Sequence, residues 1–338
     1  MTDEAATATQ VLLPADKRRA KVRALAGLVL LAGLVFWALS AIDFQEFGRV
    51  LAAAVWPPLG WACVLALFVC MPACALRLWL LLLPLSPPGR PIRYRRLLAV
   101  YIASSAAHHV LPSPLAEVGR IVYLRRRDGF DLGAVLSAQL VEKIIDVLGL
   151  ALLTFTVALF APFPLPLVGA VRWTGLVALL AVALLVLLVW RFGGTVQKEP
   201  DLAQGGGFWA RRKHATARLL RQLAAAFYTL RHPPRLVLSL AASLANELGN
   251  SATVFLCARA VGVELGAAAV FALVLAARFA GLLPSTPGQF GVVEAGVVLV
   301  LSGFGVPAPQ ALAIGLLYHL VHFVPVTLAG LGQIRRLV

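Results

Sequence analysis

Charged side chains are scarce in this chain of 338 residues, where Asp, Glu, Lys and Arg together make up 13% and apolar residues 60%. Because soluble domains average about 25% charged residues, a water-soluble globular fold is excluded. Acidic residues are the scarcest charged class: 15 stand against 30 Lys and Arg, which gives a net charge of +15. The basic residues lie in short runs between apolar blocks, as in membrane proteins, so we expect no nucleic-acid partner.

Cysteine is also sparse. The four cysteines all lie in apolar blocks: Cys63, Cys70, Cys74 and Cys257. Cys70 and Cys74 share one helix face, but neither has a His or Cys partner at a spacing that suits zinc. We therefore interpret all four as small buried apolar side chains, and we expect no cofactor and no metal.

Long apolar blocks are what the chain has in abundance, and several reach the roughly 20 residues that cross a bilayer. We expect a cytoplasmic tail at 1–23 and a single transmembrane domain at 24–338. Full spans are expected at about 24–42, 58–83, 132–160, 173–190, 236–258 and 310–333. The first could be read as a signal peptide, but its length favours a retained span. Arg77, near the end of the second span, is expected to snorkel to the cytoplasmic surface.

Two segments do not fit a full span. Residues 97–111 would form a helix of about 22 Å, shorter than the roughly 30 Å hydrocarbon core, and Pro112 and Pro114 follow it. Basic runs flank this segment on both sides, so we expect a re-entrant hairpin at about 97–124 that enters from the cytoplasm. A second hairpin, at about 266–302, is broken by LPSTPG and is expected to enter from the outer side.

The resulting fold class is an all-α polytopic membrane protein with about six full spans and two oppositely oriented re-entrant hairpins. Such an inverted repeat is typical of secondary transporters. Basic runs place both termini on the cytoplasmic side of a bacterial inner membrane. The basic segment at about 191–235 suits a helix lying on the anionic inner leaflet, and a loop that only sets topology is nearly as good a reading.

Five acidic residues lie inside apolar blocks: Glu117, Glu142, Asp146, Glu247 and Glu294. An unpaired carboxylate in hydrocarbon costs several kcal/mol, so each needs a partner, a proton or water. Glu117 can pair with Arg120 on one helix face, either in function or to pin the hairpin. Glu142 and Asp146 form a carboxylate pair that could bind a cation or carry a proton. Neutralisation by Arg120 or Arg278 is the structural alternative.

The second break offers a site for an anion. Arg278 precedes it and suits a phosphate headgroup, unless it partners Glu294 or Glu142. After Pro287, the glycines Gly288 and Gly291 permit close backbone approach, and the helix that restarts near residue 290 offers free N–H groups. A lipid phosphate would fit there, and a packing kink is the alternative.

Further polar residues accompany these charges. Asn246, Glu247 and Asn250 share a face and serve either as interhelical glue or as part of a path. Four histidines lie near the breaks or on the last span: His108, His109, His319 and His322. We expect proton handling or headgroup hydrogen bonding from His319 and its neighbours, since no metal motif is completed.

Three motifs carry a family resemblance. They read PxxxxEVxR (112–120), EKxxD (142–146) and PxxPGxFGxxE (284–294), and together they resemble the lysylphosphatidylglycerol synthase transmembrane-region family over about residues 20–336. The resemblance implies a flippase-like membrane protein. The chain departs from the usual pattern at Ser113, Pro114 and Ala116, at Lys143, and at the Tyr318-His319 pair. These departures leave the identity of the lipid open. No synthase domain follows Val338, so lysyl transfer is not expected.

The sequence therefore predicts a flippase or transporter that moves an anionic, phosphate-bearing lipid between leaflets. No GxxxxGK[ST] loop is present for ATP, and neither HExxH nor GxSxG is present to indicate an enzyme. The expected partners are a phospholipid or a polyprenyl- or hopanoid-type lipid, with a homo-oligomer or a lipid-synthesis enzyme as further candidates. An accessory subunit of a lipid-modifying or glycosyl-transfer pathway and an intramembrane lipid-modifying enzyme are the alternatives.

Overall fold

The computed structural model describes residues 43–110, 113–192, 232–280 and 289–337, and within these ranges the regular structure is entirely helical. Among these described residues, three helical stretches are long and apolar enough to cross a membrane: Trp56–Leu85, Leu132–Phe160 and Ala308–Gln333. Large apolar side chains also face outward, among them Trp61 and Phe68. This is the pattern of a membrane-embedded helical protein. The expected first span and most of the basic segment at 191–235 lie outside the described residues.

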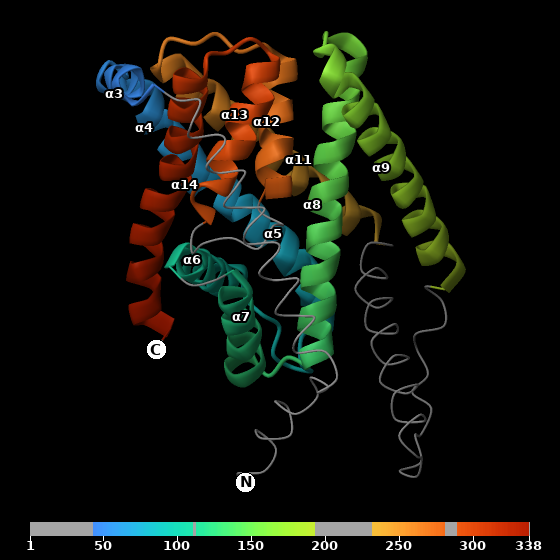
Figure 1. Cartoon of the computed structure of the whole chain (residues 1–338). Coiled ribbons are helices and arrows are strands. Elements are labelled where there is room, and N and C mark those ends of the chain that lie inside the picture. Colours follow the sequence, from blue (N-terminus) through green and yellow to red (C-terminus); the bar gives the residue numbers. More distant parts are fainter. Residues whose placement is uncertain (1–42, 111–112, 193–231, 281–288, 338) are drawn as a thin grey trace, which may run out of the picture.

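The first described helix is α3 (Phe44–Ala52), which lies across one end of the bundle (Figure 1). Asp43 caps it, because its carboxylate accepts hydrogen bonds from two backbone N–H groups of the first turn, at 2.8 and 3.2 Å. The inner face of α3 packs against the apolar core through Phe47 and Leu51. The helix therefore covers the bundle end without crossing the membrane.

One long helical stretch follows, and it is not regular along its length. It comprises α4 (Trp56–Leu65), a π-helical turn (Ala66–Cys70), α5 (Met71–Leu82) and a short 3₁₀ turn (Leu83–Leu85). Pro72 is the second residue after the π turn. Proline lacks an N–H group and its ring clashes with the carbonyl four residues earlier, so the helix widens at this point.

Two shorter helices come next, α6 (Tyr94–Val110) and α7 (Ser113–Asp128), and both lie at the same end of the bundle as the C-terminus (Figure 1). The start of α6 and the end of α7 are tied by an ion pair between Arg96 and Asp128, with a 2.7 Å distance between Nε and Oδ1. The pair therefore folds back on itself as a helical hairpin.

The two helices α8 (Leu132–Phe160) and α9 (Leu165–Phe192) pack against each other and are joined at the far end of the bundle by a short proline-rich connection. The remaining helices are α11 (Pro233–Ala260), α12 (Ala267–Ala280), α13 (Val292–Gly303) and α14 (Ala308–Leu337). Helix α14 packs closely along α6: a Cβ at Gly330 would lie 2.2 Å from the Cβ of Ala106.

The apolar interior is divided into two cores. One joins α4, the π turn, α11, α12, α13 and α14, with Leu150 from α8, and includes Ala66 and Val254. The other joins α5, α6, α7 and α8, and includes Leu78 and Val141. On α8, Glu142 and Asp146 lie between Val141 of the second core and Leu150 of the first. These two residues and the polar side chains connected to them by contacts form what we call the polar layer: Arg77, Tyr101, Arg120, Glu142, Asp146, Ser243, Asn246, Glu247, Asn250, Arg278 and Tyr318.

Candidate functional site

Arg77 on α5 is the centre of the polar layer. Its side chain is completely buried, and its guanidinium donates two hydrogen bonds to Asp146 on α8, one of them 2.6 Å from Nη2 to Oδ2. The same Nη2 lies 3.3 Å from Oε1 of Glu142, and Nη1 lies 3.0 Å from the hydroxyl of Ser243 on α11. Arg77 thus joins α5, α8 and α11 and supplies one positive charge to the carboxylate pair.

This arrangement overturns one expectation and changes one alternative. Arg77 does not snorkel to the surface, since its side chain is fully enclosed between α8 and α11. The structural alternative for Glu142 and Asp146 named Arg120 or Arg278 as the neutralising cation, but the cation in contact with both carboxylates is Arg77. A charged residue inside an apolar block was the available signal for Arg77, but its place near the end of that block favoured the wrong reading.

Arg120 on α7 is buried beside this centre. Its guanidinium lies 4.8 Å from the ring centroid of Tyr101 on α6, a cation–π contact. The Tyr101 hydroxyl in turn donates a 3.0 Å hydrogen bond to Oε1 of Glu142. No sequence signal marked Tyr101, which lies in an otherwise unremarkable stretch of α6, yet it links Arg120 to the carboxylate pair.

Glu117 does not pair with Arg120. Its Oε1 lies 3.3 Å from Nζ of Lys143 on α8, and both side chains are partly exposed, at 41% and 59%. Glu117 and Arg120 stand three residues apart on α7 and nevertheless have different partners. The hairpin is therefore pinned to α8 by Lys143, while Arg120 faces the interior.

The polar layer continues along α11 to α12 and α14. Asn246 is buried, accepts a 3.2 Å bond from the thiol of Cys74, and donates from Nδ2 to Glu247 at 2.9 Å. Oε1 of Glu247 lies 3.3 Å from Nη2 of Arg278. Arg278 is thus paired with Glu247, whereas we had expected Glu294 or Glu142 as its protein partner.

The far end of this strip of polar contacts lies on α14. Asn250 donates 2.7 and 3.1 Å hydrogen bonds to the carbonyl and the side chain of Asn246, and it accepts a 3.3 Å bond from the Tyr318 hydroxyl. The role of interhelical glue, one of the two readings of these asparagines, is visible in the contact to Tyr318. The face of α11 that carries them is also why α11, although 28 residues long, is less apolar than the three candidate spans.

Glu294 closes the start of α13. Its Oε2 accepts a 2.7 Å bond from the N–H group of Gly291, and its Oε1 lies 2.8 Å from Nδ1 of His319 on α14. Of the N–H groups that we expected to be free for a lipid phosphate, that of Gly291 is therefore taken by a carboxylate of the chain itself. A Glu three residues into a helix is a known capping position, so the spacing could have indicated it.

Histidines and aromatic rings surround this contact. The ring of Phe290 stacks on His319 with centroids 4.2 Å apart, and His109 stacks on Phe323 at 4.8 Å. Nδ1 of His109 also lies 2.9 Å from the hydroxyl of Thr327. The end of α6 and the start of α13 therefore meet α14 in one place. Of the predicted residues around the second break, Pro287 and Gly288 lie outside the described residues.

Spare hydrogen-bonding capacity remains in the polar layer. The buried Nε atoms of Arg77, Arg120 and Arg278 have no hydrogen-bond partner among the described residues. One buried carboxylate oxygen of Glu142 and one of Glu247 also lack a hydrogen-bond partner among the described residues. Buried polar groups are normally paired, so this set has the donors and acceptors to receive a polar ligand.

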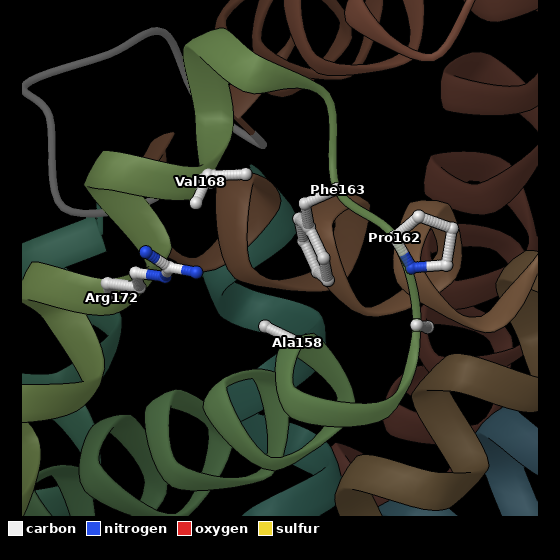
Figure 2. Close-up of a pocket in the computed structure, with 6 residues that line it drawn as sticks. Ala158, Pro162, Phe163, Val168 and Arg172 are labelled. Carbon is white, nitrogen blue, oxygen red and sulfur yellow. The ribbon is translucent and has the colours of Figure 1, made fainter.

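Neither the pocket found in the described residues nor a metal site competes with the polar layer. Figure 2 shows a hollow at the connection between α8 and α9, with Phe163 and Arg172 on opposite sides of it. It is lined by Ala158, Ala161, Pro162, Phe163, Val168 and Arg172, and it includes none of the polar-layer residues. Within the described ranges, no group of three or more His, Cys, Asp or Glu side chains is placed to hold a metal ion. The polar layer is therefore the candidate site.

Comparison with known proteins agrees with the sequence motifs. A search of the curated proteins found no match. The model of a protein family described as the lysylphosphatidylglycerol synthase TM region matches residues 24–330, which include every element of the polar layer. This chain belongs to the lysylphosphatidylglycerol synthase transmembrane-region family.

Proposed function

We propose that this protein moves an anionic, phosphate-bearing lipid between the two leaflets of the membrane. The single observation that carries the proposal is the set of three arginines in one polar layer, each with a buried Nε that lacks a hydrogen-bond partner among the described residues. Guanidinium groups bind phosphate through paired hydrogen bonds, which gives geometric as well as electrostatic recognition. A lipid phosphate is the anion that a membrane-embedded layer of this kind would meet.

The charges of the layer are equal in number but are not evenly paired. Three arginines, Arg77, Arg120 and Arg278, stand against three carboxylates, those of Glu142, Asp146 and Glu247. Arg77 contacts two of these carboxylates and Arg278 contacts the third, whereas Arg120 forms no ion pair among the described residues, so its charge is the most available to an anion. A cation or a proton as the only cargo would leave this capacity unused.

The membrane topology that suits this function is an inverted repeat of about six full spans and two re-entrant hairpins. Support comes from the helix pairs α6–α7 and α12–α13, which lie toward opposite ends of the bundle (Figure 1). The exposed arginines Arg93, Arg95, Arg125, Arg126 and Arg127 gather at the α6–α7 end. By the positive-inside rule, this end lies on the cytoplasmic side of a bacterial inner membrane, and the proposed topology puts both termini on that side.

In this mechanism, rocking of the two halves exposes the polar layer first to one leaflet and then to the other. Arg120 and Arg278 hold the phosphate, and the contact between Glu294 and His319 opens and closes the start of α13. The protein has no catalytic role, and its substrate is a phospholipid or a polyprenyl- or hopanoid-type lipid. A lipid-synthesis enzyme that makes or uses this lipid is the natural partner.

The test is transbilayer movement of fluorescent phosphatidylglycerol in proteoliposomes, followed by dithionite quenching of the outer leaflet. We expect wild-type protein to raise the quenchable fraction above one half, and Arg278→Ala and Glu294→Gln to slow the movement by about tenfold or more, as loss of a charge-assisted bond implies. Arg259→Gln is the matched control, because Arg259 forms an exposed ion pair with Glu264 outside the polar layer. Equal rates in all four proteins would contradict the site, and conversion of the lipid to a new product would favour an enzyme.

A further inference from the structure

The ion pair between Glu117 on α7 and Lys143 on α8 is open to the outside. The proposed topology puts the basic run Arg125–Arg127 at the cytoplasmic surface, and Glu117 stands about 12 Å along α7 from Arg125, while Lys143 stands about 16 Å along α8 from its start. In that topology both charges lie inside a hydrocarbon core of about 30 Å. The two side chains are nevertheless 59% and 41% exposed.

An exposed ion pair at this depth needs an explanation. Charged side chains inside a membrane are costly, and they normally face the bundle interior or a water-filled cavity. In the ion pairs of Arg77 and Arg278 the carboxylate is enclosed or nearly so, although the Arg278 side chain is itself 38% exposed. The Glu117–Lys143 pair departs from that rule and gives the seam between α7 and α8 a polar, outward-facing patch.

This patch continues directly into the polar layer. Glu117 lies one turn from Arg120, which is buried over the ring of Tyr101. Lys143 follows Glu142, whose carboxylate accepts the Tyr101 hydrogen bond and contacts Arg77. Exposure falls from Lys143 at 59% to Arg120 at 6% and Arg77 at 0%, which gives an order of these cations from outside to inside. Tyr101 contacts both Arg120 and Glu142 and so joins the two buried arginines.

We infer that the seam between α7 and α8 is the lateral entrance for the phosphodiester headgroup of an anionic phospholipid. Glu117 is the gate of this entrance: it forms an ion pair with Lys143 until a lipid phosphate displaces it. The inference rests on the proposed function and adds to it the route and the order of contacts. Lys143 first receives the phosphate, which then passes to Arg120 and the unpartnered Nε of that buried side chain. The acyl chains remain in the bilayer.

A gate and a simple staple between helices make opposite predictions. If Glu117 competes with the headgroup for Lys143, Glu117→Gln frees the lysine and strengthens lipid binding, whereas Lys143→Gln weakens it. If the pair only holds α7 to α8, both substitutions loosen the same seam and change binding in the same direction. Lys143→Arg keeps the cation and should bind within a few-fold of wild type.

The experiment titrates the full-length protein in detergent micelles with phosphatidylglycerol, phosphatidylcholine and soluble glycerol phosphate, with bound lipid counted by native mass spectrometry. We expect about tenfold weaker phosphatidylglycerol binding in Lys143→Gln and about tenfold tighter binding in Glu117→Gln, since a charge-assisted contact is gained or lost. Arg259→Gln, which breaks an exposed ion pair elsewhere, should leave binding unchanged. Thermal unfolding of each variant confirms that it is folded.

Parallel loss, or no change, in both Gln variants would overturn the gate. The same opposite shifts with glycerol phosphate, but no phosphatidylglycerol binding, would assign the seam to a soluble phosphate ester and overturn the lipid entrance. The opposite shifts with phosphatidylglycerol in a protein that moves no lipid in proteoliposomes would uphold the entrance and contradict the transport function. Failure of the two proposals is therefore distinguishable.

Discussion

Arg77 and Arg278 are the same residue type in the same polar layer, but they are held very differently. The Arg77 side chain has no exposed surface and makes four hydrogen bonds, to two carboxylates and a hydroxyl. The Arg278 side chain is 38% exposed and is held by one carboxylate at 3.3 Å. The first arginine has its charge satisfied by the protein, and the second has capacity left. Stability should therefore depend on Arg77 and ligand binding on Arg278.

The largest effect is expected from Arg77→Met. This change leaves Asp146 and Glu142 buried without their cation, and breaking a buried pair from one side costs about 3–5 kcal/mol. The measurement is the free energy of unfolding in mixed micelles, by titration with denaturing detergent. A triple variant that also carries Glu142→Gln and Asp146→Leu should recover much of the loss, because the uncompensated charges are removed. A single variant as stable as wild type would show that Arg77 is not the structural centre.

A smaller loss of stability, about 1–3 kcal/mol, is expected from Arg278→Met. The carboxylate of Glu247 loses its cation but keeps the 2.9 Å bond from Asn246. In the same protein, lipid movement should fall by about tenfold or more, so that function is affected more than folding. The comparison between the two arginines fails if Arg278→Met is destabilised as strongly as Arg77→Met while its transport remains normal.

Tyr101→Phe should lower the free energy of unfolding by about 1 kcal/mol, the value of one hydrogen bond. The hydroxyl that donates to Glu142 is lost, and the aromatic ring beneath Arg120 is kept. The same unfolding titration measures this difference. Tyr101→Leu, which also removes the ring, serves as the matched control and should cost more, since the cation–π contact adds roughly 0.5–2 kcal/mol. Equal losses would mean that the ring contact contributes nothing.

The smallest effect is expected from Arg259→Gln, which should lower the free energy of unfolding by about 0.2–1 kcal/mol. Its ion pair with Glu264 has a distance of 2.7 Å, which is shorter than that of Arg278, but both side chains are largely exposed. This variant extends the comparison to an arginine whose charge is screened by water. Raising the salt concentration should remove the remaining difference from wild type, and a salt-independent loss would be evidence against a surface pair.

Much of the polar layer could be predicted from sequence, because a charge inside an apolar block is visible without a structure. Glu142, Asp146, Glu247 and Arg278 were all identified in this way, and each lies in the layer. The helical class follows from the apolar blocks for the same reason. The function of the layer, the number of spans and the hairpin topology stay predictions.

The partners of the charges could not be predicted. A pair within one helix, such as Glu117 and Arg120, is suggested by spacing, but the observed partner of Glu117 is Lys143 on another helix. Such contacts depend on how each helix is rotated about its axis, which residue type and spacing do not determine. Tyr101 carries no signal at all, since an isolated tyrosine in a half-buried helix is ordinary.

The π-helical turn at Ala66–Cys70 has a consequence for how the buried arginine is aimed. A π turn is equivalent to one inserted residue, and one residue corresponds to about 100° of rotation in an α-helix. Everything after the turn is therefore out of phase with α4 by about a quarter of a revolution. Removal of one residue from the turn would swing the guanidinium away from Asp146 and toward another face of α5. The ion pairs of Arg77 thus depend on a change of helical phase that occurs two turns earlier in the chain.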